Sequence, residues 1–274
     1  MSENRKTLLR GGRVVDPVNG LDERIDVLIE AGCVARIGNQ PQAQTGTTVV
    51  DVPGGAVICP GFIDMHAHLR EPGHEYKETV ATGVAAAVAG GFTAVACMPN
   101  TRPVNDDAGI TRLILAKADA AGLARVYPVG AVTRGQAGEQ LAEIGELRAA
   151  GCVAVSDDGK SVANALVMRR ALEYAAMFDM PVIDHCEDAV LTGDGVAHEG
   201  YHAGVLGLRG WPAVAEEIVV ERDIALSELT GSAVHLAHLS TRGALRAVRA
   251  GKERGVAVSC EVTPHHLTLT DEQL

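Results

Sequence analysis

From residue 57 onward the sequence alternates apolar runs with alanine-rich stretches, and this alternation limits the fold more than any other feature. Such apolar runs are typical of strands buried on both faces, and the alanine-rich stretches are typical of helices packed against them. The expected strands are the run that opens 57–70 and the runs at 91–98, 125–131, 152–156, 181–185, 234–238 and 256–262. The expected helices are 78–89, 107–121, 138–149, 164–178, 213–229 and 242–254.

This alternation predicts the α/β class and, within it, a (β/α)8 TIM barrel. About seven of the eight strand–helix units are present, so we expect an incomplete, C-terminally truncated barrel that lacks its last strand. An open doubly wound sheet is the alternative, but no glycine-rich phosphate loop follows the first expected strand. Residues 57–274 form the predicted barrel domain.

Residues 1–56 lack the alternation. Short strand candidates lie at 8–15, 25–30, 34–37 and 47–52, and turns containing glycine or proline separate them. A meander with so few strands is not stable unaided. We therefore expect residues 1–56 to be the N-terminal part of a small β-sandwich domain that packs on a later part of the chain.

Charge and composition argue against several classes of partner. The net charge is −11 and no block of Lys and Arg stands out, which argues against nucleic acid and membrane as partners. The six cysteines are scattered and form no C-x-x-C pair, as expected of free thiols in a reducing compartment. No apolar run approaches the length that spans a bilayer. These features predict a soluble, cytoplasmic protein.

Side chains with metal-ligand chemistry gather at the expected carboxyl ends of the strands. His66 and His68 are two residues apart and therefore leave a strand from the same face. Asp158 follows the fourth strand, His185 ends the fifth and His238 ends the sixth. Because the carboxyl ends of barrel strands meet at one mouth, these five side chains are expected to converge. Imidazole with carboxylate is a ligand set that suits zinc, so the pattern predicts a zinc site.

Other residues near these strand ends have different expected roles. Arg70 lies just past the two histidines of the first strand, where its guanidinium is suited to bind a carboxylate through two hydrogen bonds. His235 stands at odd spacing from His238 and is expected to face the helices. His265 and His266 follow the seventh strand, so one of them is a weaker candidate for the site.

The stretch 61–73, GFIDMHAHLREPG, resembles the first-strand signature of the amidohydrolase superfamily, and its LREPG end resembles the type I dihydroorotases. The similarity continues through motifs at 98–103, 156–159, 185–188, 198–200, 238–241 and 261–267, in the same order. The resemblance implies reversible hydrolysis of (S)-dihydroorotate to N-carbamoyl-L-aspartate, a step of pyrimidine synthesis. It also implies one or two Zn²⁺ ions per subunit as cofactor.

Roles for individual residues follow from the same resemblance. It implies that the first-strand histidines bind one zinc, that the aspartate after the fourth strand contacts or bridges the metals, and that two further histidines complete the second position. In this sequence the implied ligands are His66, His68, Asp158, His185 and His238. His68, Arg70 and Asn100 resemble the substrate-binding residues. The proton-shuttle aspartate of the family is expected beyond Leu274, so this chain offers no assignment for it.

Two alternatives remain open at this point. Hydantoinases and related members bridge their metals with a carbamylated lysine of the fourth strand, whereas here the matching position is Asp158 and Lys160 lies beyond the strand. This favours the dihydroorotase reading over a hydantoinase-like or dihydropyrimidinase-like cyclic amidase. A non-catalytic scaffold for aspartate carbamoyltransferase is the second alternative, although such chains usually lose metal ligands.

Three expectations concern the whole protein. We expect a homo-oligomer, and aspartate carbamoyltransferase is a candidate partner. We also expect that these 274 residues expressed alone bind zinc poorly and show no turnover, because a barrel without its last strand leaves two unpaired edges.

Overall fold

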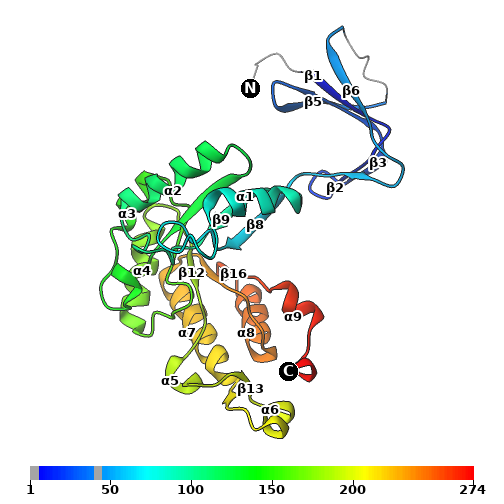
Figure 1. Ribbon diagram of the computed structural model, residues 1–274. Coiled ribbons are helices and arrows are strands. Elements are labelled where there is room, and N and C mark those ends of the chain that lie inside the picture. Colours follow the sequence, from blue (N-terminus) through cyan, green and yellow to red (C-terminus); the bar gives the residue numbers. More distant parts are fainter. Residues whose placement is uncertain (1–5, 40–44) are drawn as a thin grey trace. The chain divides into compact units, whose positions relative to one another are not determined.

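The computed structural model describes residues 6–39 and 45–274 (Figure 1). The chain divides into two compact units, Met1–Phe62 and Ile63–Leu274. The division falls after Phe62, a few residues later than the boundary expected at residue 56. Each unit has its own buried apolar residues, and each is described here by itself.

The N-terminal unit contains two small sheets. The four-stranded sheet has the order β5-β4-β1-β6, and the three-stranded sheet has the order β3-β2-β7. Their strands are β1 (Lys6–Arg10), β2 (Arg13–Asp16), β3 (Leu21–Arg24), β4 (Asp26–Glu30), β5 (Cys33–Gly38), β6 (Thr47–Asp51) and β7 (Val57–Ile58). Val14, Ile25 and Val27 form the buried centre, with Ile58 packed against them.

The placement of β7 corrects one expectation. Residues 57–58 pair in parallel with β2 and belong to the N-terminal unit, so they do not begin the first barrel strand. That strand, β8, is Phe62–Ala67. Pro60 and Gly61 lie between the two strands, and proline cannot donate a ladder hydrogen bond, which accounts for the break.

The second unit is built on a seven-stranded sheet with the order β16-β15-β12-β11-β10-β9-β8. Neighbouring strands from β9 through to β16 pair in parallel. After β8 the strands are β9 (Phe92–Cys97), β10 (Arg125–Gly130), β11 (Ala154–Ser156), β12 (Val182–Asp184), β15 (Val234–Leu236) and β16 (Val258–Cys260). This curled parallel sheet is the incomplete barrel that the sequence predicts.

Helices follow the strands where the alternation places them. They are α1 (Val80–Ala89), α2 (Ala108–Ala121), α3 (Ile144–Ala150), α4 (Ala165–Ala176), α7 (Val214–Thr230) and α8 (Arg242–Glu253). Thr79, Asp107, Asn164 and Thr241 cap the N-termini of α1, α2, α4 and α8 with side-chain oxygens, which explains where these helices begin. Helix α3 is shorter than expected, because residues 138–143 are not helical and Leu141 instead pairs with Thr133 in an isolated β-bridge.

The remaining elements are short. The excursion between β12 and α7 contains α5 (Ala189–Thr192), β13 (Ala197–His198), α6 (Tyr201–Leu206) and β14 (Gly210–Trp211). After β16 come α9 (Pro264–Thr268) and the 3₁₀ turn η2 (Asp271–Gln273). Within the described part of the chain, no helix is both long and apolar enough to cross a membrane.

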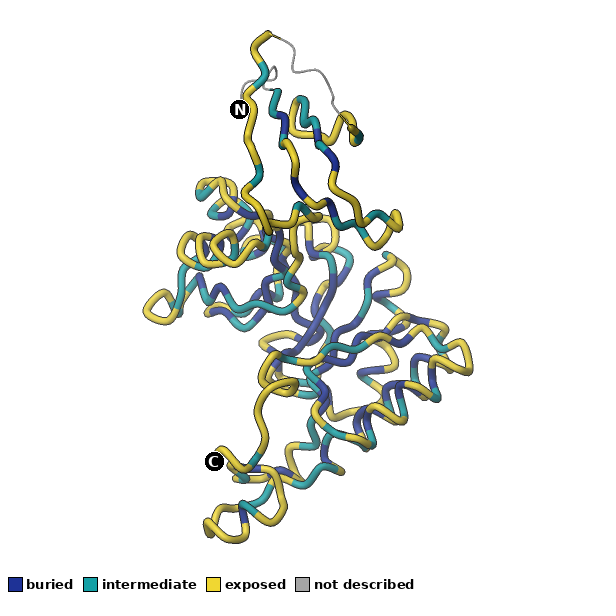
Figure 2. Tube along the Cα trace, turned by 90° about the vertical axis from the view of Figure 1, so that its right-hand side faces the viewer, coloured by how far each residue is buried: buried dark blue, intermediate teal, exposed yellow. Residues whose placement is uncertain are grey.

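Strand residues alternate between two buried layers. Val155, Val182 and Leu236 pack with residues of the surrounding helices, whereas Ala154 and Ile183 join the small cluster on the other face of the sheet. Figure 2 shows the resulting pattern, with buried stretches along the inner strands and exposed turns around them. This alternation sends every second side chain to the interior and so decides which strand-end residues can meet.

Strand β8 differs from the expectation of burial on both faces. Ile63 is 64% exposed and Met65 is 54% exposed. The physical reason is the position of β8 at one edge of the sheet, with β16 at the other edge. Among the described residues, no strand pairs with the outer side of either one.

Candidate metal centre

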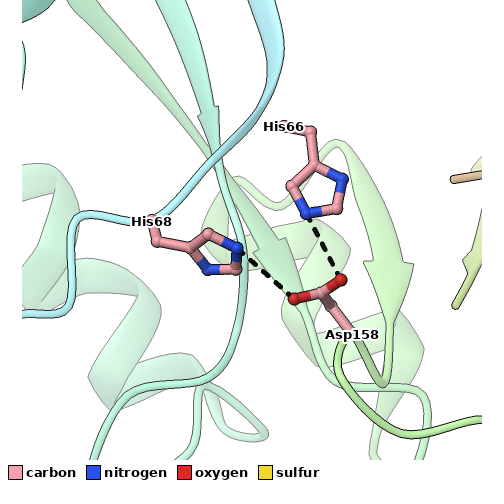
Figure 3. Close-up of side chains that lie close together, drawn as sticks. All are labelled: His66, His68 and Asp158. Atoms are coloured by element: carbon pink, nitrogen blue, oxygen red, sulfur yellow. Dashed lines mark ion pairs between the residues drawn. The ribbon is translucent and has the colours of Figure 1, made fainter. Parts of the chain in front are cut away.

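The five predicted ligand residues lie together at the carboxyl edge of the parallel sheet. Their ligand atoms form two groups. Within each group the ligand atoms lie within 4.8 Å of one another, and one aspartate belongs to both groups. The first group is His66, His68 and Asp158, and the second is Asp158, His185 and His238. Figure 3 shows both imidazoles of the first group turned toward the Asp158 carboxylate.

The first group depends on strand β8 and the loop after β11. His66 Nε2 lies 3.3 Å from Asp158 Oδ1, and His68 Nε2 lies 3.6 Å from Asp158 Oδ2. The neighbouring Asp157 turns the other way, where its carboxylate accepts the backbone N–H groups of Val132 and Thr133 at 2.8 and 3.0 Å. Asp157 therefore anchors the loop and leaves Asp158 facing the centre.

The second group joins the ends of β12 and β15. His185 Nδ1 lies 3.1 Å from His238 Nε2, and His238 Nε2 lies 3.7 Å from Asp158 Oδ1. His238 has a φ of 36°, in the left-handed region that a residue with a side chain rarely adopts. Such strain is typical of functional sites, where the surrounding structure holds a side chain in place.

In three of the histidines one ring nitrogen faces the other candidate ligands. The second ring nitrogen forms a hydrogen bond with a residue that is not a candidate ligand. His66 Nδ1 lies 2.7 Å from Glu261 Oε1, and His185 Nε2 lies 2.8 Å from Glu187 Oε2. His68 Nδ1 lies 2.9 Å from Asn100 Oδ1. Outer partners of this kind fix the tautomer and orientation of histidines that bind metals.

Electrostatics favour an ionised aspartate at the middle of the site. Burial alone would raise the pKa of Asp158, but interactions with His238 and His66 outweigh it and hold this pKa well below its usual range. Burial also lowers the pKa of His66, yet hydrogen bonds to Asp158 and Glu261 raise it to about 9. In His68 burial prevails and lowers the pKa. At neutral pH Asp158 is therefore a carboxylate, ready to face a cation.

The two residues expected to bind substrate have different surroundings. Asn100 donates its Nδ2 hydrogen to Asp158 Oδ2 at 2.9 Å and accepts from His68, so it joins two members of the first group. Arg70 has a φ of 58°, and no carboxylate of the described residues forms an ion pair with its guanidinium. Arg70 is thus a cation beside the centre without a protein anion.

His235 corrects a second expectation. It does not face the helices, because Val234 and Leu236 on either side of it take those positions in the helix-facing core. Instead its Nδ1 lies 2.8 Å from Ser259 Oγ, and its Nε2 lies 3.4 Å from Glu261 Oε2. Alternation along β15 is the physical reason, since the middle residue of the three points to the interior.

Sequence reasoning gave no role to Glu187 or Glu261, the two glutamates that contact ligand histidines. The available signal was their position, since Glu261 comes directly after β16 and Glu187 lies two residues after His185. His265 and His266 are in neither ligand group. They line a cavity of about 550 Å³ that also reaches His185 and His238.

That cavity extends from the second ligand group toward the excursion between β12 and α7. Glu187 and Glu216 supply carboxylates to its wall, and Trp211, the sole tryptophan of the chain, lies on the same wall. A concave site beside convergent polar groups is the usual form of a small-molecule site. The geometry therefore provides space for a substrate next to the candidate ligands.

A curled parallel sheet with two ligand groups at its carboxyl edge defines the class of (β/α)-barrel proteins with a candidate metal centre. Residues 55–244 match the family described as "Dihydro-orotase-like". The chain belongs to this family.

Individual relatives agree with that assignment. The chain is 58% identical to a dihydroorotase of Anaeromyxobacter sp. (strain K) and 54% identical to one of Pelobacter propionicus, with 97% of this chain covered in both. It covers 61% and 62% of those relatives, so it spans about three fifths of their length.

Solved structures show the same fold. The L-hydantoinase (dihydropyrimidinase) of Arthrobacter aurescens matches with a TM-score of 0.81 at 18% identity, and the D-hydantoinase of a Thermus species matches with 0.75 at 26%. These matches cover 97% of this chain and 60% and 59% of the two hydantoinases.

Proposed function

We propose that this chain carries the metal centre of a dihydroorotase, which hydrolyses (S)-dihydroorotate reversibly to N-carbamoyl-L-aspartate in pyrimidine synthesis. The observation that carries the proposal is the Asp158 carboxylate shared by two histidine pairs, with the unpaired Arg70 beside it. The family supports the same reaction class, because the relatives that match over nearly the whole chain are dihydroorotases.

The cofactor in this proposal is Zn²⁺, one or two ions per subunit. The donor set fits such ions, since four imidazoles and an ionised carboxylate form two adjoining groups of ligand atoms. His66 and His68 would hold one ion, His185 and His238 the other, and Asp158 would contact both. A bound Zn²⁺ supplies Lewis acidity, which activates water near neutral pH and polarises an amide carbonyl.

The protein's own residues place and orient the substrate. The Arg70 guanidinium would accept the carboxylate of dihydroorotate through paired charge-assisted hydrogen bonds. Asn100 holds His68 and Asp158 at fixed spacing, and it presents its amide on the same side. The low pKa of Asp158 keeps its carboxylate anionic at neutral pH. Asp158 therefore neutralises the charge of a bound metal ion and does not supply a proton.

The first alternative activity is a cyclic amidase for neutral rings, as in the solved hydantoinases of the same fold. The local chemistry favours the anionic substrate, because Arg70 has no ion-pair partner among the described residues and a neutral ring would not supply an opposite charge. Lys160 lines a separate cavity with Gln136 and Asn164 and belongs to neither ligand group.

The test compares two substrates and two metal states of the full-length protein, because these 274 residues alone are expected to show no turnover. Zinc-loaded protein should hydrolyse dihydroorotate faster than dihydrouracil, and removal of the metal with a chelator should abolish the activity until zinc is restored. Faster turnover of dihydrouracil would favour the cyclic-amidase alternative. Protein that binds no zinc would favour the scaffold alternative.

Substitution of Arg70 gives a sharper prediction. Arg70→Met should lower kcat/KM for dihydroorotate by about 10²- to 10⁴-fold, because two hydrogen bonds to a charged group contribute about 1.5–3 kcal/mol each. Hydrolysis of a neutral ring should change little. Steady-state kinetics on both substrates measure the difference, and Arg112→Met, at an exposed position of α2, is the control. Equal losses on both substrates would contradict the assignment.

We also propose a cytoplasmic location and a homo-oligomeric state for the enzyme. All six cysteines are free thiols, which suits a reducing compartment. An association with aspartate carbamoyltransferase stays a prediction. Size-exclusion chromatography with light scattering, with and without the carbamoyltransferase, measures both assemblies.

A further inference from the structure

Glu261 connects the two outer strands of the barrel sheet at the metal centre. It directly follows β16, whereas His66 lies on β8 at the opposite edge of the sheet order. Because the sheet curls, Glu261 Oε1 comes within 2.7 Å of His66 Nδ1, although 195 positions separate the two residues in the sequence. The contact is therefore made by the fold and not by the local chain.

Both oxygens of this carboxylate lie near imidazoles. The second oxygen, Oε2, lies 3.4 Å from His235 Nε2, and His235 in turn contacts Ser259 through Nδ1 at 2.8 Å. The Glu261 side chain is 15% exposed, so little of it faces solvent. The hydrogen bond that the Glu261 carboxylate makes is the one to His66, so Glu261 acts on the site through His66.

The chemistry of the contact fixes the role of His66. The carboxylate at Nδ1 holds a proton on that nitrogen, so Nε2, which lies 3.3 Å from Asp158, is the ring nitrogen that would bind the metal. His68 has a neutral amide, Asn100, in the corresponding place. An anionic partner makes an imidazole a stronger electron donor than a neutral partner does.

We propose that Glu261 is a positioning residue that makes His66 the strongest histidine ligand of the group formed by His66, His68 and Asp158. The inference rests on the proposed metal centre. His235 supports Glu261 from the other side and keeps its second oxygen from turning toward the metal. The other ligand group, with His185 and His238, does not contact Glu261 in the described residues.

The test measures affinity of the full-length protein for Zn²⁺ alone, by competition with a chromophoric chelator, because these 274 residues alone are expected to bind zinc poorly. Glu261→Leu should weaken the affinity about 10- to 100-fold, the usual effect of removing such a partner. Glu261→Gln retains an acceptor for the His66 N–H and should recover part of the loss. Glu228→Gln removes an exposed carboxylate paired with Arg254 and should leave the affinity unchanged.

A spectroscopic signature separates positioning from a purely structural role. Co²⁺-substituted protein should show a shifted visible ligand-field band in both Glu261 variants and an unchanged band in Glu228→Gln. His235→Gln should have a smaller effect than Glu261→Leu, because it leaves the contact with His66 in place. Circular dichroism confirms that each variant is folded.

Each outcome decides the proposal. Zinc affinity and Co²⁺ spectra equal to those of the unmodified chain in both Glu261 variants would overturn it, and so would a larger effect of His235→Gln than of Glu261→Leu. If the unmodified chain itself binds no zinc, the proposed metal centre fails and this inference fails with it. That result differs from the others because it is seen before any substitution.

Discussion

Replacing Asp158 with alanine is expected to remove bound zinc and to lower kcat/KM for dihydroorotate by about 10³-fold or more. Asp158 is the residue common to both ligand groups, so its loss leaves two histidine pairs without their shared carboxylate ligand. Metal chemistry contributes several kcal/mol to such reactions, and about 4 kcal/mol corresponds to a factor of about 10³. Metal analysis by mass spectrometry and steady-state kinetics measure the two effects.

The companion variants make this result specific. Asp158→Asn preserves the size of the side chain and should also lose most of the zinc, because the charge is what faces the cation. Asp119→Asn changes an exposed aspartate of α2 and should retain both zinc and activity. Stoichiometric zinc and nearly normal turnover in Asp158→Ala would show that the two histidine pairs do not depend on their shared carboxylate.

Replacing Arg222 with methionine is expected to lower the free energy of unfolding by about 3–5 kcal/mol, the usual cost of breaking a buried ion pair. Arg222 lies on α7, where its Nη2 is 2.7 Å from Asp223 Oδ1 and 3.4 Å from Asp184 Oδ2. The side chains of Asp223 and Asp184 are 0% and 1% exposed. Without the guanidinium, two buried carboxyl groups lose their cation.

The same arginine also ties together two loops of the metal centre. Its Nη1 donates to the carbonyl of Val162 at 2.9 Å, in the loop that follows Asp158, and Asp184 directly precedes His185. Urea unfolding followed by circular dichroism measures the change. Arg254→Met, which breaks an exposed pair with Glu228, should cost no more than about 1 kcal/mol. Similar costs for the two variants would contradict the assigned role of burial.

The pH dependence of Arg222→Met has a definite sign. Burial, and next to it the neighbouring Asp223, raise the pKa of Asp184 above its usual value, so the folded protein holds a proton more tightly than the unfolded chain does. Stability from such a group falls as the pH rises from the unfolded pKa toward the folded one. The deficit of Arg222→Met relative to the unmodified chain should therefore shrink as the pH is lowered from 7 toward 5.

The repeating pattern of the sequence was enough to predict the barrel sheet and most of its helices. Strand and helix periods are local properties, and side-chain caps such as Asp107 and Asn164 mark helix starts within a few residues. The extent of burial was not predictable in the same way. Ile63 and Met65 have the composition of a buried strand, yet they are exposed because β8 lies at a sheet edge.

The candidate ligands were predictable because each one stands at the end of an apolar run. His66 and His68 share a face through their spacing alone, and the barrel topology brings the other strand ends to the same edge. What surrounds these ligands depended on contacts across the sheet. The pairing of Glu261 with His66 joins residues 195 positions apart, and no local signal indicates it.

The sequence by itself determined the order of strands and helices, the residue types at the strand ends and the position of Arg70 just past the two histidines. Only the tertiary structure decided that Asp158 lies between both histidine pairs, that His235 faces inward and that the half-buried Arg222 contacts two buried carboxyl groups. The physical reason is the distance along the sequence over which each effect acts. Periodicity and capping involve residues a few positions apart, whereas hydrogen bonds between strand ends depend on how the whole sheet curls.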